Sequence, residues 1–229
     1  MLSSRRFVRQ GLAIVAKDLR LEWRTRAIFT SMFVFTVLVI VVFNFAIGAD
    51  PERIRAVAPG VLWVALLFAT VLGLQRAVQV ESEEDCLQGV LLAMGDRSAL
   101  FAAKVVVNVC YLSVVALGAL PLFSIWFRID IISCLGALSI VLILGIVGLS
   151  LVGTLFAMIS ANTRTRGLQL PLLFLPVSVP LTIAAVYATT ELIQGRGLPD
   201  IRDYLTLMVV FDVVFFVVTL LVFDYVVEE

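Results

Sequence analysis

The stretch "SCLGALSIVLILGIVGLSLVGTLFAMIS", residues 133–160, decides the fold of this chain. It carries no charged side chain, and it is longer than the roughly 20 residues that an α-helix needs to cross a bilayer. A backbone inside lipid finds no hydrogen-bond partner outside itself, so a spanning run of this kind must be helical. The stretch therefore predicts a transmembrane helix at about 133–158.

The same apolar character recurs along the whole chain. Its 229 residues are 62% hydrophobic and 15% charged, whereas a soluble domain is about half apolar and a quarter charged. We therefore expect an all-α, polytopic membrane protein with a six-helix domain over residues 27–223. The expected spans are at about 27–48, 58–75, 100–123, 133–158, 168–190 and 204–223.

Residues 1–26 predict an amphipathic helix on the cytoplasmic membrane surface. Five apolar residues recur at helical spacing and so share one face, while the rest of the segment is strongly basic. Such a helix lies in the interface, with its arginines near the lipid head groups and its tryptophan at the boundary. A simple anchor without any partner explains the pattern equally well. The apolar residues are Val8, Leu12, Val15, Leu19 and Trp23, and the interfacial candidates are Arg20, Trp23 and Arg24.

The basic residues also predict the orientation of the chain. If the N-terminus is cytoplasmic, twelve of the 17 lysines and arginines fall in inner segments and five in outer segments. Cytoplasmic loops carry such an excess. We therefore expect both termini inside, with a short cytoplasmic tail at 224–229.

The segment "VQVESEEDCLQGVLLAMGDRSALF", residues 78–101, is acidic and only half apolar. Ser82 and Asp85 form a capping box that places a helix start near Glu83, and an apolar stripe follows at helical spacing. We interpret a helix at about 83–94 as a surface on which another protein acts, although an inert solvated helix remains an alternative. The candidate contacts with an ATPase are Glu81, Glu83, Glu84, Asp85, Leu87, Gln88 and Leu91.

Two spans carry residues that change helix shape or packing. Pro176 and Pro180 lie four apart in the fifth span, and each removes a backbone hydrogen bond and bends the helix. Such a span could move or line a cavity, or it could hold a static kink. The fourth span carries small residues that let helices approach closely, namely Gly136, Gly145, Gly148 and Gly153.

Asp212 lies near the middle of the sixth span. A carboxylate inside the membrane costs a few kcal/mol, so it is a functional candidate by default. Asn108 in the third span is a candidate neutral partner. Two other interpretations stay open: Asp212 could be protonated, or it could only join two helices by a hydrogen bond.

Several kinds of chemistry are missing from the sequence. It has no histidine, which removes the commonest general base and metal ligand. It has no GxxxxGK[ST] motif for binding ATP, and its three cysteines form no CxxC pair. We expect a non-catalytic membrane subunit without a metal or a tightly bound cofactor, which draws any energy from the ATPase of another chain.

The layout resembles that of ABC-2 type permeases, in which a short cytoplasmic helix sits in a groove of the ATPase. Four stretches also resemble the cytochrome c maturation protein B family, the haem exporter permease subunit. Arg76, Glu84 and Asp85 are in register with the family's loop, and Pro176 and Pro180 with its fifth span. The stretches are "KDLRLEWR" (17–24), "LQRAVQVESEEDCLQGVLL" (74–92), "AAK" (102–104) and "TRTRGLQLPLLFLPVSVPLTI" (163–183).

This resemblance implies a role in c-type cytochrome biogenesis at the bacterial inner membrane. It implies a separate ATPase that binds ATP, a haem-handling membrane protein, a small membrane peptide and, indirectly, a periplasmic haem chaperone. ATP hydrolysis would drive haem export or release of the haem-loaded chaperone, with haem as a handled substrate. A second copy of the chain is expected, because a nucleotide-binding dimer has two grooves. The alternatives are an exporter permease for another lipophilic substrate and a non-transporting scaffold.

Overall fold

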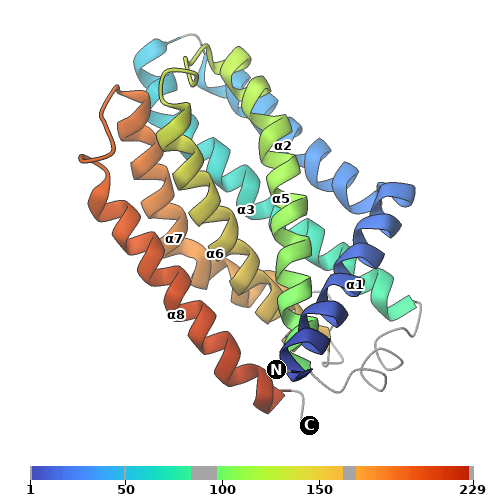
Figure 1. The fold of residues 1–229 in the computed structure, drawn as a ribbon. Helices are drawn as coiled ribbons and strands as arrows, with labels where there is room; N and C mark the ends of the chain where they lie inside the picture. The colour runs from blue at the N-terminus through green and yellow to red at the C-terminus, as the bar shows by residue number, and fades with distance from the viewer. Residues whose placement is uncertain (1, 49, 84–96, 162–168, 227–229) are drawn as a thin grey trace.

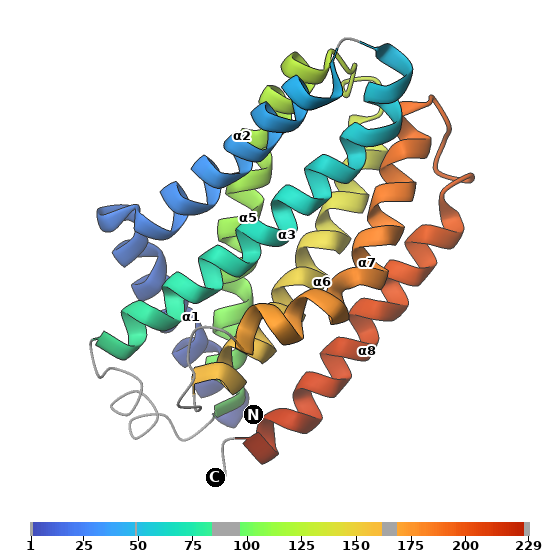
Figure 2. The ribbon, with the colours of Figure 1, turned by 180° about the vertical axis from the view of Figure 1, so that it is seen from behind.

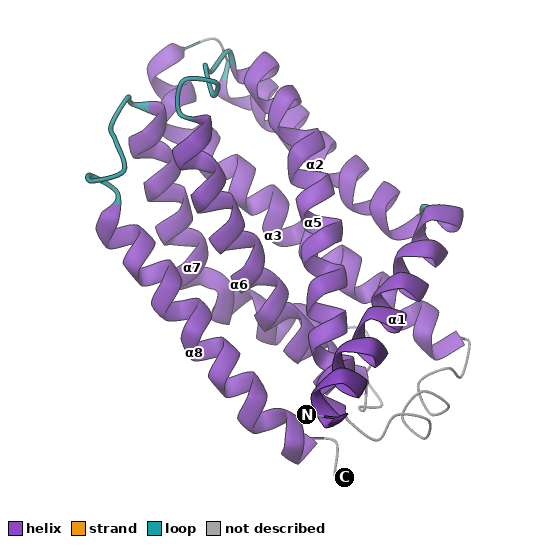
Figure 3. Ribbon diagram, viewed as in Figure 1, coloured by secondary structure: helices purple, strands orange, loops and turns teal. Residues whose placement is uncertain are grey.

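The computed structural model describes residues 2–48, 50–83, 97–161 and 169–226. Within these ranges the chain forms seven helices and no strand, and Figure 3 shows the loops between α5 and α6 and between α7 and α8. The helices are α1 (Leu2–Thr25), α2 (Ala27–Ile47), α3 (Pro51–Glu83), α5 (Arg97–Phe127), α6 (Leu135–Ala161), α7 (Gln169–Ile193) and α8 (Arg202–Val226).

Six of these helices are long and apolar enough to cross a membrane: α2, α3, α5, α6, α7 and α8. They correspond one to one with the six predicted spans, so the polytopic all-α fold is confirmed. The seventh helix, α1, is not among the candidate spans. It lies across α5, transverse to α3, instead of adding another parallel helix to the bundle (Figure 1).

Helix α3 forms the centre of the bundle. In its apolar window 72% of the residues are buried, against 22% in α2 and in α8. It packs against α2, α5, α6 and α7, and Figure 2 shows it between α2 and α7. The outer helices keep large apolar side chains exposed, including Phe45 and Leu221. A helix that is apolar all round is suited to a lipid surrounding.

The ends of α3, α6 and α8 and the beginnings of α5 and α7 lie together at one end of the bundle (Figure 1 and Figure 2). We call this the basal end. Helix α1 lies at the same end. The loops between α5 and α6 and between α7 and α8 lie at the opposite end (Figure 3).

Glycines of α6 make room for large side chains of α3. A methyl group at Gly145 would overlap the ring of Trp63, and one at Gly153 would overlap Leu74. Around Gly136, by contrast, no atom lies within 4 Å of the position of such a methyl group. The predicted role in close packing is therefore confirmed at Gly145 and Gly153, but it is wrong at Gly136, where α6 begins outside the contact.

Helix α7 is continuous but bent. Pro176 and Pro180 both lie inside it, and Figure 2 shows α7 changing direction along its length. Both proline rings are exposed, whereas Ser178 and Leu181 are buried against the bundle. The expected bend is thus present, and movement of this helix stays a prediction.

Helix α3 runs further toward the basal end than the sequence predicted. It continues to Glu83 instead of ending near residue 75, so Ser82 and Glu83 are the last turn of α3. The predicted helix start near Glu83 is therefore wrong, because the glutamate-rich and glutamine-rich segment favours continued helix and contains no helix breaker. The rest of the predicted surface helix lies outside the described residues, including Glu84, Asp85, Leu87, Gln88 and Leu91.

Candidate functional site

The contact between α1 and α5 at the basal end uses part of the predicted apolar face of α1 together with two acids that the sequence did not predict there. Val15 and Leu19 are partly buried against the core, and Asp18 and Glu22 are buried between the helices. These four positions share one face at helical spacing. The part of α1 that packs on the bundle therefore combines apolar contact with two carboxylates.

Two residues of the predicted apolar face do not pack on the bundle. Leu12 is 64% exposed and Trp23 is 79% exposed. At 3.6 residues per turn, both fall beside the packed face and next to the basic side of the helix. The single apolar face predicted for α1 is thus divided: Val15 and Leu19 contact the protein, whereas Leu12 and Trp23 are exposed.

Asp18 is the centre of the contact with α5. Its Oδ2 accepts a hydrogen bond of 2.8 Å from Lys104 Nζ, and the two side chains are 11% and 19% exposed. The hydroxyl of Tyr111, two turns further along α5, donates to the backbone oxygen of Asp18 at 3.3 Å. Lys17 Nζ lies 3.3 Å from the other carboxylate oxygen, but its side chain is half exposed. The shielded partner of Asp18 is therefore Lys104.

Glu22 fixes the turn between α1 and α2. Its Oε1 accepts a hydrogen bond of 2.7 Å from the backbone N–H of Phe29, in the first turn of α2. Arg26, the residue at the start of α2, has a left-handed backbone with φ of 52° and gives no side-chain cap. A carboxylate satisfies the free N–H groups and the positive dipole end of a helix. Glu22 thus caps α2 from the preceding helix.

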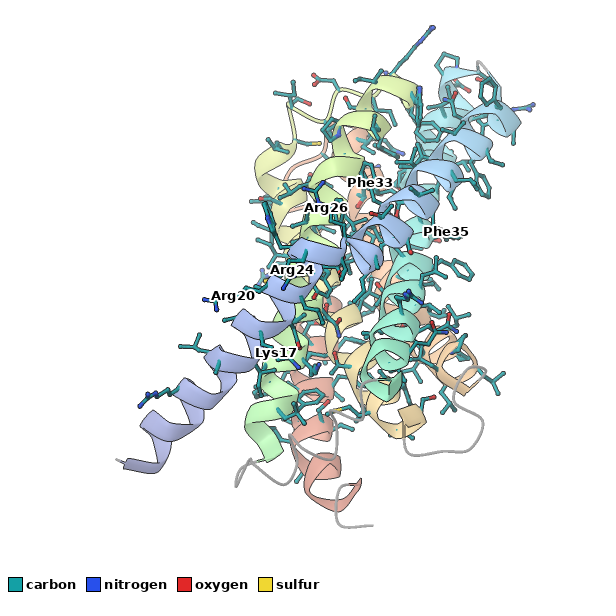
Figure 4. All side chains as sticks on the ribbon, turned by 90° about the vertical axis from the view of Figure 1, so that its right-hand side faces the viewer. Lys17, Arg20, Arg24, Arg26, Phe33 and Phe35 are labelled. Atoms are coloured by element: carbon teal, nitrogen blue, oxygen red, sulfur yellow. The ribbon has the colours of Figure 1, made fainter. Side chains whose placement is uncertain are left out.

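The exposed side of α1 is basic. Both of the acids in the described part of the helix are buried, while Lys17, Arg20 and Arg24 are exposed. Figure 4 shows these residues along the outside of α1, with Arg20 projecting away from the bundle. This arrangement agrees with the basic face expected at Arg20 and Arg24, and contact with a membrane surface stays a prediction.

The structure pairs Asn108 with Thr154 and not with Asp212. The side-chain amide of Asn108 donates a hydrogen bond of 2.7 Å to Thr154 Oγ1 and so joins α5 to α6. The expected pairing of Asn108 with Asp212 is therefore wrong, because Thr154 on the neighbouring helix supplies the acceptor.

The other predicted site residues are not brought together into one site. Pro176 and Pro180 lie on the exposed side of α7, and Asp212 is buried on α8. Glu81 and Glu83 end α3 at the basal end.

Sequence reasoning missed the three residues that join α1 to the bundle. A signal for them existed. Lys104 lies inside the third predicted span, and a buried lysine needs a counter-charge. Asp18 and Glu22 are four apart in a segment that is otherwise basic, and this spacing places both on one helix face. The pairing of Asp18 with Lys104 could not be predicted from the sequence, because 86 residues separate them and only the folded structure brings them together.

The described residues contain no group of three or more histidine, cysteine, aspartate or glutamate side chains that could hold a metal ion.

Comparison with known proteins gives one consistent result. The profile of the family described as "CcmB protein" matches residues 9–228. Heme exporter protein B of Pseudomonas aeruginosa is 29% identical over 182 residues, which is 80% of this chain and 81% of the relative. The protein of the same name from Rhodobacter capsulatus is 30% identical over 75% of this chain and 78% of its own. That of Haemophilus influenzae is 27% identical over 82% of both chains.

Proposed function

The chain belongs to the CcmB protein family, and from this premise we propose that it is the membrane permease subunit of a haem exporter for c-type cytochrome biogenesis. Its relatives are named heme exporter protein B, and its six apolar helices suit a transport subunit. It carries no P-loop motif, so the energy comes from a separate ATPase subunit. The subunit handles haem as a substrate and has no catalytic residue of its own.

The site at which the ATPase acts is the connection between α3 and α5. Glu81 and Glu83 end α3, and the acidic residues Glu84 and Asp85 follow. A force applied to this connection reaches two helices at once: α3, which is the most buried helix, and α5. The remaining proposed contacts with the ATPase are Leu87, Gln88 and Leu91.

The observation that carries this mechanism is the ion pair between Lys104 and Asp18. Lys104 lies within two turns of the beginning of α5, so any displacement of that end also displaces α1. Glu22 then connects α1 to the first turn of α2. The ATPase would thus move α1, α2, α3 and α5 as one body against α6, α7 and α8, with Pro176 and Pro180 allowing α7 to bend.

This movement drives haem export or release of the haem-loaded periplasmic chaperone. The assembly contains the ATPase, a haem-handling membrane protein, a small membrane peptide and a second copy of this chain. It resides in the bacterial inner membrane with both termini in the cytoplasm. In this orientation the basal end faces the ATPase, and Arg20, Trp23 and Arg24 of α1 lie in the inner interface.

A charge-reversal variant tests the proposal. Glu84→Lys combined with Asp85→Lys should abolish cytochrome c maturation in cells while the chain still accumulates in the membrane. The matched control reverses two exposed acids at the other end of the bundle, Glu52→Lys with Asp203→Lys, and should leave the yield unchanged. Normal maturation in the first variant would exclude this connection as the site of coupling.

Co-purification then separates the haem exporter from its alternatives. The tagged chain is purified from detergent-solubilised membranes, and its partners are identified by mass spectrometry. Recovery of an ATPase together with a haem-handling membrane protein supports the haem exporter. Recovery of the ATPase alone would favour an exporter of another lipophilic substrate. Normal maturation with a catalytically dead ATPase would leave only a scaffold role.

A further inference from the structure

Asp212 is a buried carboxyl group in the middle of a membrane span. The span of α8 runs from Arg202 to Leu221, and at 1.5 Å per residue Asp212 lies about 15 Å from its start. That depth is the centre of a hydrocarbon core about 30 Å thick. Asp212 is 9% exposed, and its Oδ1 has no hydrogen-bond partner among the described residues.

The carboxyl group lies against two other helices. It occupies the space that Gly148 leaves on α6, because a methyl group there would overlap both Asp212 Oδ1 and the side chain of Leu181 on α7. Gly148 thus serves close packing, as the sequence predicted, and what it accommodates is an acid. Leu181 directly follows Pro180, so the cover over Asp212 belongs to the bent part of α7.

No counter-charge is available on the helices that surround Asp212. Helix α6 has no ionisable side chain from Leu135 to Ala161. Helix α7 has only Tyr187 and Glu191, both beyond Leu181 toward the end opposite the basal end. On α5, Lys104 is held by Asp18. On α8 itself, the ionisable residue nearest to Asp212 in sequence is Tyr204, eight residues away. The other ionisable residues of α5 and α8 are Arg97, Cys110, Tyr111, Arg202, Asp203, Asp224 and Tyr225.

We propose that Asp212 is a proton-binding site at the contact of α6, α7 and α8, which holds a proton while Gly148 and Leu181 enclose it and releases the proton when that contact opens to water. An ionised carboxylate without a counter-ion or a donor is far more costly to bury than a neutral carboxyl group. The packed contact therefore favours the protonated form, and by linkage protonation stabilises the contact. Deprotonation at high pH accordingly weakens the packing of α8 on α6.

The proton site is independent of what the chain transports. It links the bend at Pro176 and Pro180 to proton binding, because a displacement of α7 removes Leu181 from Asp212. An opening of this kind would release one proton, and closing would take one up. The ligand of this site is thus the proton itself.

Infrared spectroscopy of the full chain in a detergent that contains no ester group tests the proposal. Exposed aspartate and glutamate side chains are ionised at neutral pH, so the C=O stretching band of protonated carboxylic acids reports enclosed groups. The wild-type chain should show this band at pH 7, and Asp212→Asn should lose it. Asp203→Asn, which alters an exposed acid on the same helix, should retain it. Absence of the band from the wild type, or its persistence in Asp212→Asn, would overturn the proposal.

A second measurement covers the case in which Asp212→Asn does not accumulate. Asp212→Glu keeps an ionisable group, so its carboxyl band should persist at pH 7 at a shifted frequency. An unshifted band would assign the signal to another residue and would refute proton binding at Asp212. Thermal unfolding gives an independent readout. The wild type should lose stability as the pH rises from neutral to alkaline, and the slope should be smaller in Asp212→Asn. Identical slopes would contradict the linkage.

Discussion

Lys104 Nζ and Asp18 Oδ2 lie 2.8 Å apart and join α5 to α1 in a shielded ion pair. The two residues come from stretches that separately resemble the family, "KDLRLEWR" at 17–24 and "AAK" at 102–104. The structure brings these stretches together at the basal end. The pair therefore makes α1 part of the moving body that the proposed mechanism requires.

The ion pair should behave as a buried pair and not as a surface pair. Removing one partner, in Asp18→Ala or Lys104→Ala, breaks a shielded, charge-assisted hydrogen bond and should destabilise the bundle by roughly 1.5–3 kcal/mol. The double variant should lose less than the sum of the two single losses. Thermal unfolding of the wild type, the two single variants and the double variant in detergent measures these losses of stability. The control Lys17→Ala, which alters the half-exposed neighbour, should cost less than about 1 kcal/mol. Additive losses in the double variant would contradict the pairing.

Glu22 should stabilise the turn between α1 and α2. Glu22→Ala removes the acceptor for the Phe29 N–H and should cost about 1 kcal/mol, as loss of a helix cap does. Trypsin should then cleave after Arg26 several times faster than in the wild type. Glu22→Gln keeps an acceptor oxygen and should restore most of the protection. Arg20→Gln, an exposed change on the same helix, is the control, and equal cleavage rates for Glu22→Ala and this control would refute the cap.

The glycines of α6 should differ sharply in their tolerance of a methyl group. Gly148→Ala forces a side chain against Asp212 and Leu181 and should destabilise the bundle by about 1–3 kcal/mol. Gly136→Ala adds its methyl group where no atom lies within 4 Å, so it should be neutral or slightly stabilising, since alanine favours helix over glycine. Unfolding temperatures of the two variants give the comparison, and equal effects would disprove the packing described for α6.

Cys134 offers a test of orientation. It lies at the start of α6, at the end opposite the basal end, and burial raises the pKa of its thiol above the ordinary value. Because the thiolate is the reactive form, its labelling should be slow at neutral pH and should accelerate as the pH rises toward that pKa. In a chain that carries Cys86→Ser and Cys110→Ser, a membrane-impermeant maleimide applied from the periplasmic side should label Cys134, and adding Cys134→Ser should abolish the labelling. Labelling only from the cytoplasmic side would reverse the proposed orientation.

The spans were predictable because hydropathy alone fixes them. Lipid leaves the backbone no alternative to a helix, so an uncharged run such as residues 133–160 can only form a membrane-spanning helix. The bend of α7 was predictable for a similarly local reason, since Pro176 and Pro180 lack the N–H that a straight helix needs.

The contacts between helices were not predictable from local patterns. Asp18 and Glu22 looked like minor interruptions of a basic helix until Lys104 and the first turn of α2 supplied their partners. The sequence offered Asp212 as a partner of Asn108, and only the packing of α5 on α6 selects Thr154. A capping pattern at Ser82 predicted a helix start, but α3 continues through it.

One measurement tests the coupling of α1 to α5 most directly. The charge reversal Asp18→Lys and the restored pair Asp18→Lys with Lys104→Asp are compared in cells for cytochrome c yield and in the purified complex for ATP hydrolysis. We predict that the single variant assembles and hydrolyses ATP but fails in maturation, and that the swapped pair recovers a substantial part of the yield. Normal maturation by Asp18→Lys at equal protein level would contradict the claim that this pair transmits the action of the ATPase.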